Sequence, residues 1–194
     1  MICHARNSQR RAAAASRAGL TLLENLMTLG IMVVTVLGMA QALLDSMTTN
    51  TMNREVAVAT DGARRVISDL QGADFGSIFA LYNSSQTGNT LGGQTISAGA
   101  FAIDGLTPVN GDADGMVGQI LLPESTNFLG TVELREDLDN ARFGMPRDLD
   151  GNGTSGDALD HSGDYQVLPV VIEVDWRGPK GPAHVEFKTV LSRY

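Results

Sequence analysis

The chain has 194 residues, of which 43% are hydrophobic, and its formal net charge is −8. This length suits one modest domain with an anchor, and the composition excludes both a disordered chain and a protein with many membrane spans. Residues 104–164 contain 13 acidic side chains and only three arginines. Because such a surface repels phosphate groups, we exclude nucleic acid as a partner.

Residues 1–19 form a basic leader, which we interpret as a targeting segment outside the fold. It has no acidic residue and four arginines, which orient this end toward the cytoplasm: Arg6, Arg10, Arg11 and Arg17. Its small residues come before the apolar region, which favours cleavage on the cytoplasmic side of a retained helix over an uncleaved signal anchor. The single cysteine, Cys3, lies in this leader, so the remaining chain forms no disulfide.

Residues 20–44 form an apolar stretch. No charge occurs from Leu26 to Leu44, and a helix of this length covers about 28 Å, close to the hydrocarbon core of a bilayer. Glu24 lies just before this uncharged run. An acid at the edge of a membrane helix is costly unless a positive group meets it, so Glu24 is a candidate functional residue.

The segment Gly19-Leu20-Thr21-Leu22-Leu23-Glu24, between a basic leader and an apolar helix, resembles the prepilin signal of type IV pilins and type II secretion pseudopilins. The resemblance implies that a prepilin peptidase cleaves between Gly19 and Leu20, and that the new amino group of Leu20 is methylated. It also implies that this amine, from the same or an adjacent subunit, pairs with Glu24 during assembly. Leu20 stands where the family usually has Phe, and Gln41 lies near the place where many members have Pro.

We interpret residues 45–70 as the amphipathic half of the same helix. Apolar residues recur at steps of three and four, which predicts one buried helix face: Met52, Val56, Ala59, Ala63, Val66 and Leu70. The first proline is Pro108, so we expect a single helix from about Leu20 to Leu70. A coiled coil has similar spacing, but the pattern is short and rich in alanine, which favours burial under a sheet.

Residues 71–118 are expected to form a variable loop region, because Gly, Ser and Asn cluster between positions 83 and 94. A short strand is expected at 100–103. In the pilin family, the variable region lies between the helix and the sheet.

Residues 119–194 are expected to form an antiparallel sheet head with an acidic loop at 136–164. Short apolar runs predict strands at 119–122 and 131–134. Strict alternation over 170–176 and 185–191 predicts a hairpin with one buried face, joined by a six-residue connection at 177–182. The fold class is therefore α+β, and the resemblance implies a pilin-like fold with a long N-terminal α-helix packed on a small antiparallel β-sheet.

The acidic loop contains half of a calcium-binding pattern. Asp148, Asp150 and Asn152 alternate before Gly153, as in the first half of a calcium loop. Leu159 occupies the position of the usual bidentate acid, but Asp157 and Asp160 lie close by. Two interpretations of these five polar residues are therefore open. They bind calcium, or they form solvated Asp/Gly turns on an acidic surface. A second stretch, 110–115, repeats the half pattern, and some pseudopilins hold calcium in their C-terminal loops.

The sequence contains no recognisable catalytic set. It has no Gly-rich phosphate loop, zinc-ligand spacing or nucleophile elbow. His161 lies in a polar loop beside Asp160 and Asp164, and His184 is expected on the outer face of a strand. We interpret the proximity of His161 to these acids as chance, and expect a protein that is not an enzyme.

The resemblance implies a minor pilin-like subunit of a type IV pilus, cleaved by prepilin peptidase and assembled with other pilin subunits through its N-terminal helix. Before assembly it would cross the inner membrane once, with the leader cytoplasmic and the head outside. Two alternatives remain: a minor pseudopilin of a type II secretion system, and a membrane-anchored calcium-binding or adhesive module.

Overall fold

The computed structural model describes residues 5–193, with side chains from residue 21 onward. One long helix, α1 (Ala5–Gly72), opens the chain. The chain divides into two compact units, Met1–Asn50 and Thr51–Tyr194, and each is described by itself. We call the second unit, residues 51–194, the head.

In the first unit, the described part of α1 is an exposed apolar helix. Every side chain from Thr21 to Met47 is exposed. Its threonine hydroxyls donate hydrogen bonds back to helix carbonyls, as Thr35 Oγ1 does to the Ile31 oxygen at 2.7 Å and Thr48 Oγ1 to the Leu44 oxygen at 2.8 Å. These bonds satisfy polar groups without water. By length and composition, Thr21–Gly72 is a helix able to cross a membrane.

The C-terminal part of α1 supplies one wall of the head's core. Ala59, Ala63, Val66 and Leu70 are buried, as their spacing predicts. The buried face begins later than expected, because Val56 is 43% exposed. The helix then ends at Gly72, two residues beyond the predicted position.

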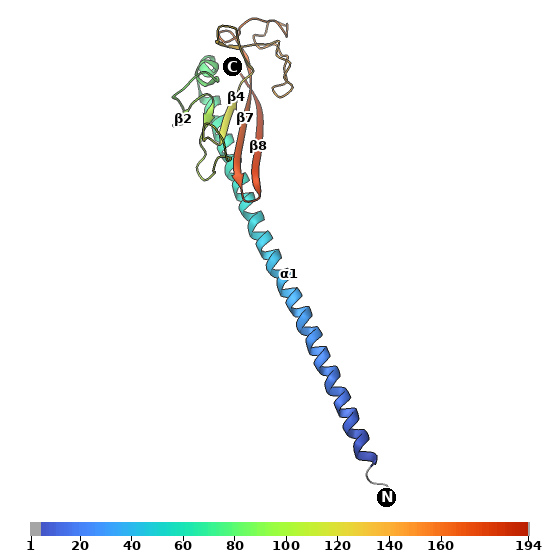
Figure 1. Cartoon of the computed structure of the whole chain (residues 1–194). Helices are drawn as coiled ribbons and strands as arrows, with labels where there is room; N and C mark the ends of the chain where they lie inside the picture. The colour runs from blue at the N-terminus through green and yellow to red at the C-terminus, as the bar shows by residue number, and fades with distance from the viewer. Residues whose placement is uncertain (1–4, 194) are drawn as a thin grey trace. The chain divides into compact units, whose positions relative to one another are not determined.

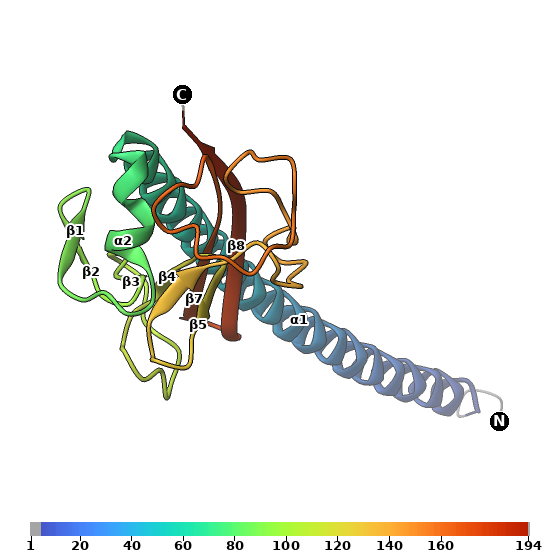
Figure 2. The same cartoon turned by 90° about the horizontal axis from the view of Figure 1, so that it is seen from above.

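The other wall is a four-stranded antiparallel sheet of order β3-β4-β7-β8. Its strands are β3 (Ala100–Phe101), β4 (Gly118–Leu121), β7 (Val167–Gly178) and β8 (Gly181–Ser192). Figures 1 and 2 show β4 and β7 beside the C-terminal part of α1, and the buried side chains of both form one cluster. A long helix packed on small antiparallel sheets confirms the α+β class.

The C-terminal hairpin has the predicted buried face but a shorter connection than predicted. Val170, Ile172, Val174 and Trp176 are at most 1% exposed. Pairing continues to Gly178 opposite Gly181, so the turn has two residues and the expected six-residue connection was wrong. Pro182 is tolerated in the ladder because β8 is an edge strand, where one row of N–H groups is free of pairing.

The region 71–118 is more ordered than the predicted variable loop. It contains a 3₁₀ turn, η1 (Phe75–Ser77), a helix, α2 (Ile78–Tyr82), and a hairpin of β1 (Asn89–Leu91) and β2 (Gln94–Ile96). The predicted short strand at 100–103 appears as β3, at Ala100–Phe101. Elements of three to five residues are too short to show a helical or strand period, and tertiary burial of Phe79 and Ile96 orders them instead.

A third, small sheet precedes the acidic loop. It pairs β5 (Glu124–Thr126), which the sequence did not predict, with β6 (Val132–Leu134), which matches the predicted strand at 131–134. Between β6 and β7 the described chain has neither helix nor strand. This interval contains the predicted acidic loop, 136–164.

Gly99 lies against the backbone of β4, and we expect Gly99→Ala to destabilise the head. Gly99 has a φ of 77°, and a Cβ there would overlap the carbonyl oxygen of Ile120. Strain in the left-handed region costs about 1–2 kcal/mol, and the overlap adds about 1–3 kcal/mol. Urea unfolding of the detergent-solubilised chain, followed by fluorescence of the single tryptophan, Trp176, measures the loss.

Gly93→Ala is the matched control for this change. Gly93 has a similar φ of 84°, but a Cβ there would meet no atom within 4 Å. It should therefore show only the backbone strain. Equal losses of stability for the two variants would contradict the close packing of Gly99 against β4.

Candidate functional site

The residues of the predicted prepilin signal are only partly described. Gly19 and Leu20, the predicted cleavage and methylation site, lie outside the residues whose side chains the structure describes. Glu24 is described: its side chain is exposed on α1, and it is the single charged residue between Thr21 and Leu44. The predicted pairing of Glu24 with the amine of Leu20 stays a prediction.

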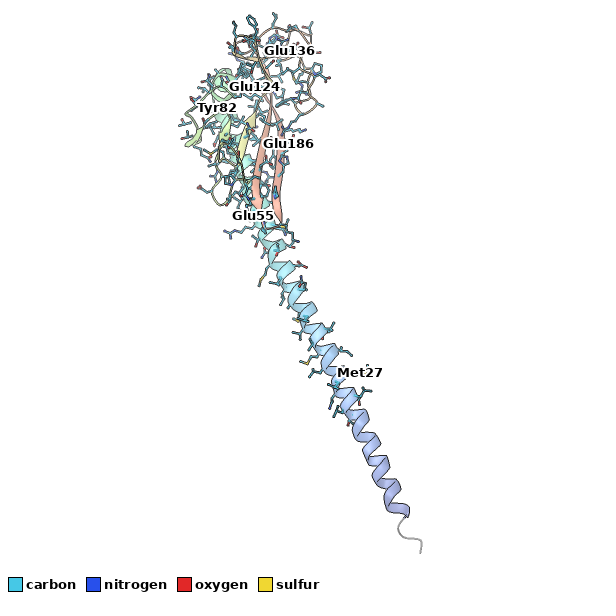
Figure 3. All side chains as sticks on the ribbon, in the orientation of Figure 1. Met27, Glu55, Tyr82, Glu124, Glu136 and Glu186 are labelled. Carbon is cyan, nitrogen blue, oxygen red and sulfur yellow. The ribbon has the colours of Figure 1, made fainter. Side chains whose placement is uncertain are left out.

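The acidic loop is attached to the strands on both sides of it. The backbone N–H of His161 donates to the carbonyl of Leu134 in β6 at 2.9 Å. The N–H groups of Gln166 and Val167 both donate to the carbonyl of Leu149, at 2.7 and 3.0 Å, and the side chain of Leu149 is fully buried. These contacts hold the loop's acidic side chains at one end of the head, where Figure 3 labels Glu136.

The first three predicted calcium ligands make local turns. Both carboxylate oxygens of Asp148 accept backbone N–H bonds, from Gly151 at 2.7 Å and Gly153 at 2.8 Å. Asp150 accepts the N–H of Asn152 at 3.0 Å, and this bond is the main reason that the pKa of Asp150 lies below its usual value. The Asn152 side-chain oxygen accepts bonds from Thr154. These oxygens therefore already accept hydrogen bonds from backbone N–H groups of the same loop.

The five predicted calcium ligands do not converge on one point. Asp160 faces β6, where its Oδ1 accepts the N–H of Leu134 at 3.2 Å. It belongs to none of the groups of candidate metal ligands found among the described side chains. Those groups place Asp148 and Asp150 with Glu136, and Asp157 with Glu136 and His161. Calcium at the predicted residues stays a prediction.

In the second half pattern, 110–115, two side chains also accept hydrogen bonds through their oxygens. The side-chain oxygen of Asn110 accepts a hydrogen bond from Arg177 at 3.2 Å, and Asp114 accepts the N–H of Met116 at 2.9 Å. Within residues 21–193, no group of three candidate metal ligands includes this stretch.

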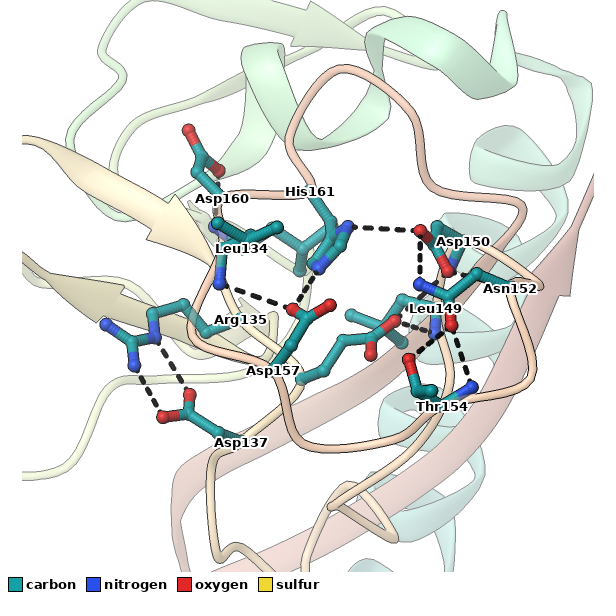
Figure 4. Close-up of polar contacts among 12 residues, drawn as sticks. Leu134, Arg135, Asp137, Leu149, Asp150, Asn152, Thr154, Asp157, Asp160 and His161 are labelled. Carbon is teal, nitrogen blue, oxygen red and sulfur yellow. Dashed lines mark hydrogen bonds and ion pairs between the residues drawn. The ribbon is translucent and has the colours of Figure 1, made fainter.

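His161 lies in the loop as expected, but it is a buried residue. It is 2% exposed. Its Nε2 lies 2.8 Å from Asp157 Oδ1, and its Nδ1 lies 3.2 Å from Asp164 Oδ1 and 3.8 Å from Asp150 Oδ2. Figure 4 shows the imidazole between the carboxylates of Asp150 and Asp157. The histidine therefore joins acidic residues from separate parts of the loop.

The carboxylates around His161 change its acid–base behaviour and that of Asp157. Burial lowers the pKa of the His161 imidazole, but the hydrogen bond with Asp157 and the surrounding negative charges outweigh burial and raise this pKa above its ordinary value. The same hydrogen bond lowers the pKa of the Asp157 carboxyl. The site thus favours a positive charge at the position of the imidazole.

Glu136 is the functional candidate that the sequence reasoning missed. It is fully buried. Its Oε1 accepts the backbone N–H groups of Leu149 and Asp150, whereas its Oε2 has no hydrogen-bond partner. One signal could have found it: Glu136 lies two residues after the buried Leu134, so the strand period of two directs it inward.

A separate, more exposed group lies on the hairpin. Glu173 and Asp175 in β7 form this group with His184 in β8, which lies opposite Asp175. His184 Nδ1 lies 2.9 Å from Asp175 Oδ1, and the His184 side chain is 46% exposed, in agreement with its predicted outer-face position. Exposed pairs of this kind contribute little to stability.

No family model, curated protein or solved structure matches this chain.

Proposed function

We propose that this protein is a minor pilin-like subunit of a type IV pilus, processed before Leu20 and assembled into a filament through α1. The single observation that supports this proposal most strongly is the segment from Gly19 to Glu24 at the start of an apolar stretch of α1 whose side chains are exposed from Thr21 to Met47. Its head has a structural role in the assembly, without catalysis.

The exposed apolar helix needs a partner that is not water. Large hydrophobic side chains cover all sides of the segment 21–47, each at least half exposed. They include Leu22, Leu26, Ile31, Val34, Leu37, Met39 and Leu44. Soluble monomers rarely expose a continuous apolar surface of this size. The inner membrane covers this surface before assembly, and neighbouring helices cover it in the filament.

Glu24 distinguishes one axial position of this otherwise uniform apolar helix relative to its neighbours. A carboxylate in an apolar bundle is strongly disfavoured without a positive partner. Cleavage before Leu20 creates an amine about one helical turn away in sequence, and the same group on an adjacent subunit is also available. Pairing with the amine of an adjacent subunit favours one axial register over others, because a shifted helix leaves both charges unpaired. Pairing within one subunit neutralises Glu24 in any register.

Mass spectrometry of the membrane-extracted protein tests the proposed processing. We expect a chain that begins at a methylated Leu20 and lacks the 19-residue leader. Full-length protein, or a chain cut after the apolar stretch, would contradict the proposal. Recovery of the mature chain in sheared filaments tests the assembly step separately.

A further inference from the structure

Glu136 is a buried carboxyl group that the described residues leave incompletely hydrogen-bonded. Its side chain is fully buried, and Oε2 has no hydrogen-bond partner. Buried polar atoms normally have a partner, and an unpaired carboxylate oxygen is among the most costly groups to leave alone. This orphaned oxygen therefore points to a ligand that the described side chains do not supply.

Two further ligand atoms lie close to the Glu136 carboxyl group. One carboxylate oxygen of Glu136, one of Asp157 and one imidazole nitrogen of His161 all lie within 4.8 Å of one another. Glu136 and His161 are buried, and Asp157 is half-buried. Ligand atoms bound at about 2.0–2.2 Å to a common tetrahedral ion are about 3.3–3.6 Å apart, so the three side chains have to close around the ion. Small side-chain movements would thus bring the three atoms onto one ion.

The imidazole is already oriented for such a role. Its Nε2 faces Asp157 at 2.8 Å, whereas its Nδ1 faces Asp164 at 3.2 Å. A histidine that binds a metal through one nitrogen commonly donates its other N–H to a carboxylate, which fixes the tautomer and ring orientation. Asp164 is placed to accept that N–H.

The donor set selects a class of ion. Calcium takes six to eight oxygen ligands, whereas an imidazole nitrogen with carboxylate oxygens suits zinc and similar transition metals. We propose that Glu136, Asp157 and His161 bind one divalent transition-metal ion of the zinc class, which ties the two ends of the acidic loop together. The site differs from the predicted calcium set, which contains neither Glu136 nor His161. It is also independent of the proposed assembly through α1.

The ion has a structural task in this chain. Glu136 lies directly after β6, and His161 lies shortly before β7. A metal joining them closes the loop much as a disulfide would, and no cysteine follows Cys3. Binding to the folded loop alone stabilises the head in proportion to the free ion concentration.

Calorimetry on the full chain in detergent tests the site. The chain is freed of metal with a chelator and carries Cys3→Ser and His4→Gln, which remove two other ligands for soft ions. We expect Zn²⁺ to bind with one-to-one stoichiometry and more tightly than Ca²⁺. Glu136→Gln and His161→Gln should each raise the Kd for Zn²⁺ at least about tenfold. Zn²⁺ should also raise the unfolding temperature reported by Trp176 fluorescence.

Three controls keep the result interpretable. His184→Gln removes the exposed histidine of the hairpin group and should leave zinc affinity unchanged. Asp160→Asn changes a loop carboxylate that faces β6 and should also have little effect. Asp157→Asn, at a half-buried position, replaces Glu136→Gln if that variant fails to fold.

The same experiment defines the results that would overturn the proposal. One is the absence of zinc binding to the folded parent chain. Another is zinc affinity that survives His161→Gln but falls with His184→Gln, which would move the site to the hairpin. A third is calcium binding tighter than zinc binding and insensitive to His161→Gln, which would favour an oxygen-only site.

Discussion

The Gly19→Ser variant should accumulate as full-length protein in the membrane. The resemblance to prepilins places Gly19 directly before the cleaved bond, where an added side chain occupies the space that the peptidase needs around that bond. We expect processing to fall from near completion to an undetectable level. Mass spectrometry and immunoblotting of the membrane fraction measure the ratio of full-length to mature chain.

Gly30→Ser is the matched control, because it makes the same chemical change farther along α1. A Cβ at Gly30 meets no atom within 4 Å, and serine is tolerated in a helix, so this variant should be processed normally. If Gly19→Ser still loses 19 residues, the assigned cleavage site is wrong. If both variants remain full length, the change acts on membrane insertion rather than on cleavage.

Replacing Glu24 should block filament assembly without blocking processing. In Glu24→Ala the amine of Leu20 enters an apolar bundle without its partner, and removing one member of a buried ion pair costs about 3–5 kcal/mol. At about 1.4 kcal/mol for each tenfold change, incorporation should fall at least about a hundredfold. The amount of subunit in sheared filaments, relative to the mature chain in the membrane, measures the effect.

Two further variants separate charge from side-chain size. Glu24→Gln keeps the length and hydrogen-bonding capacity of Glu24 but removes its charge, so it should assemble as poorly as Glu24→Ala. Asn25→Ala removes a neighbouring polar group and should assemble normally. Normal incorporation of Glu24→Gln would contradict charge pairing, even if cleavage before Leu20 proceeds as proposed.

The parts of the fold that are regular over many residues could be predicted from the sequence. The recurrence of Ala59, Ala63, Val66 and Leu70 places one face of α1 in the core, because a helix repeats every 3.6 residues. Alternation from Val170 to Trp176 does the same for β7. Both patterns persist long enough to reveal their period.

The half calcium pattern in the acidic loop is compatible with two different uses of the same side chains. Asp148, Asp150 and Asn152 have the spacing of calcium ligands, yet their oxygens accept bonds from their own loop. Asp and Asn also favour turns through such bonds to nearby backbone N–H groups. Spacing alone cannot separate these two uses of the same side chains.

The sequence by itself determined the α+β class, the apolar helix with its single carboxylate, and the long C-terminal hairpin, because each depends on order along the chain. Only the tertiary structure decided that residues 71–118 contain packed elements and that Glu136 and His161 are buried side by side. The burial of these two residues depends on how β6 and β7 hold the ends of the loop between them. This closure of the loop cannot be predicted from a helical or strand period in the sequence, because it is made by contacts between residues far apart in the chain.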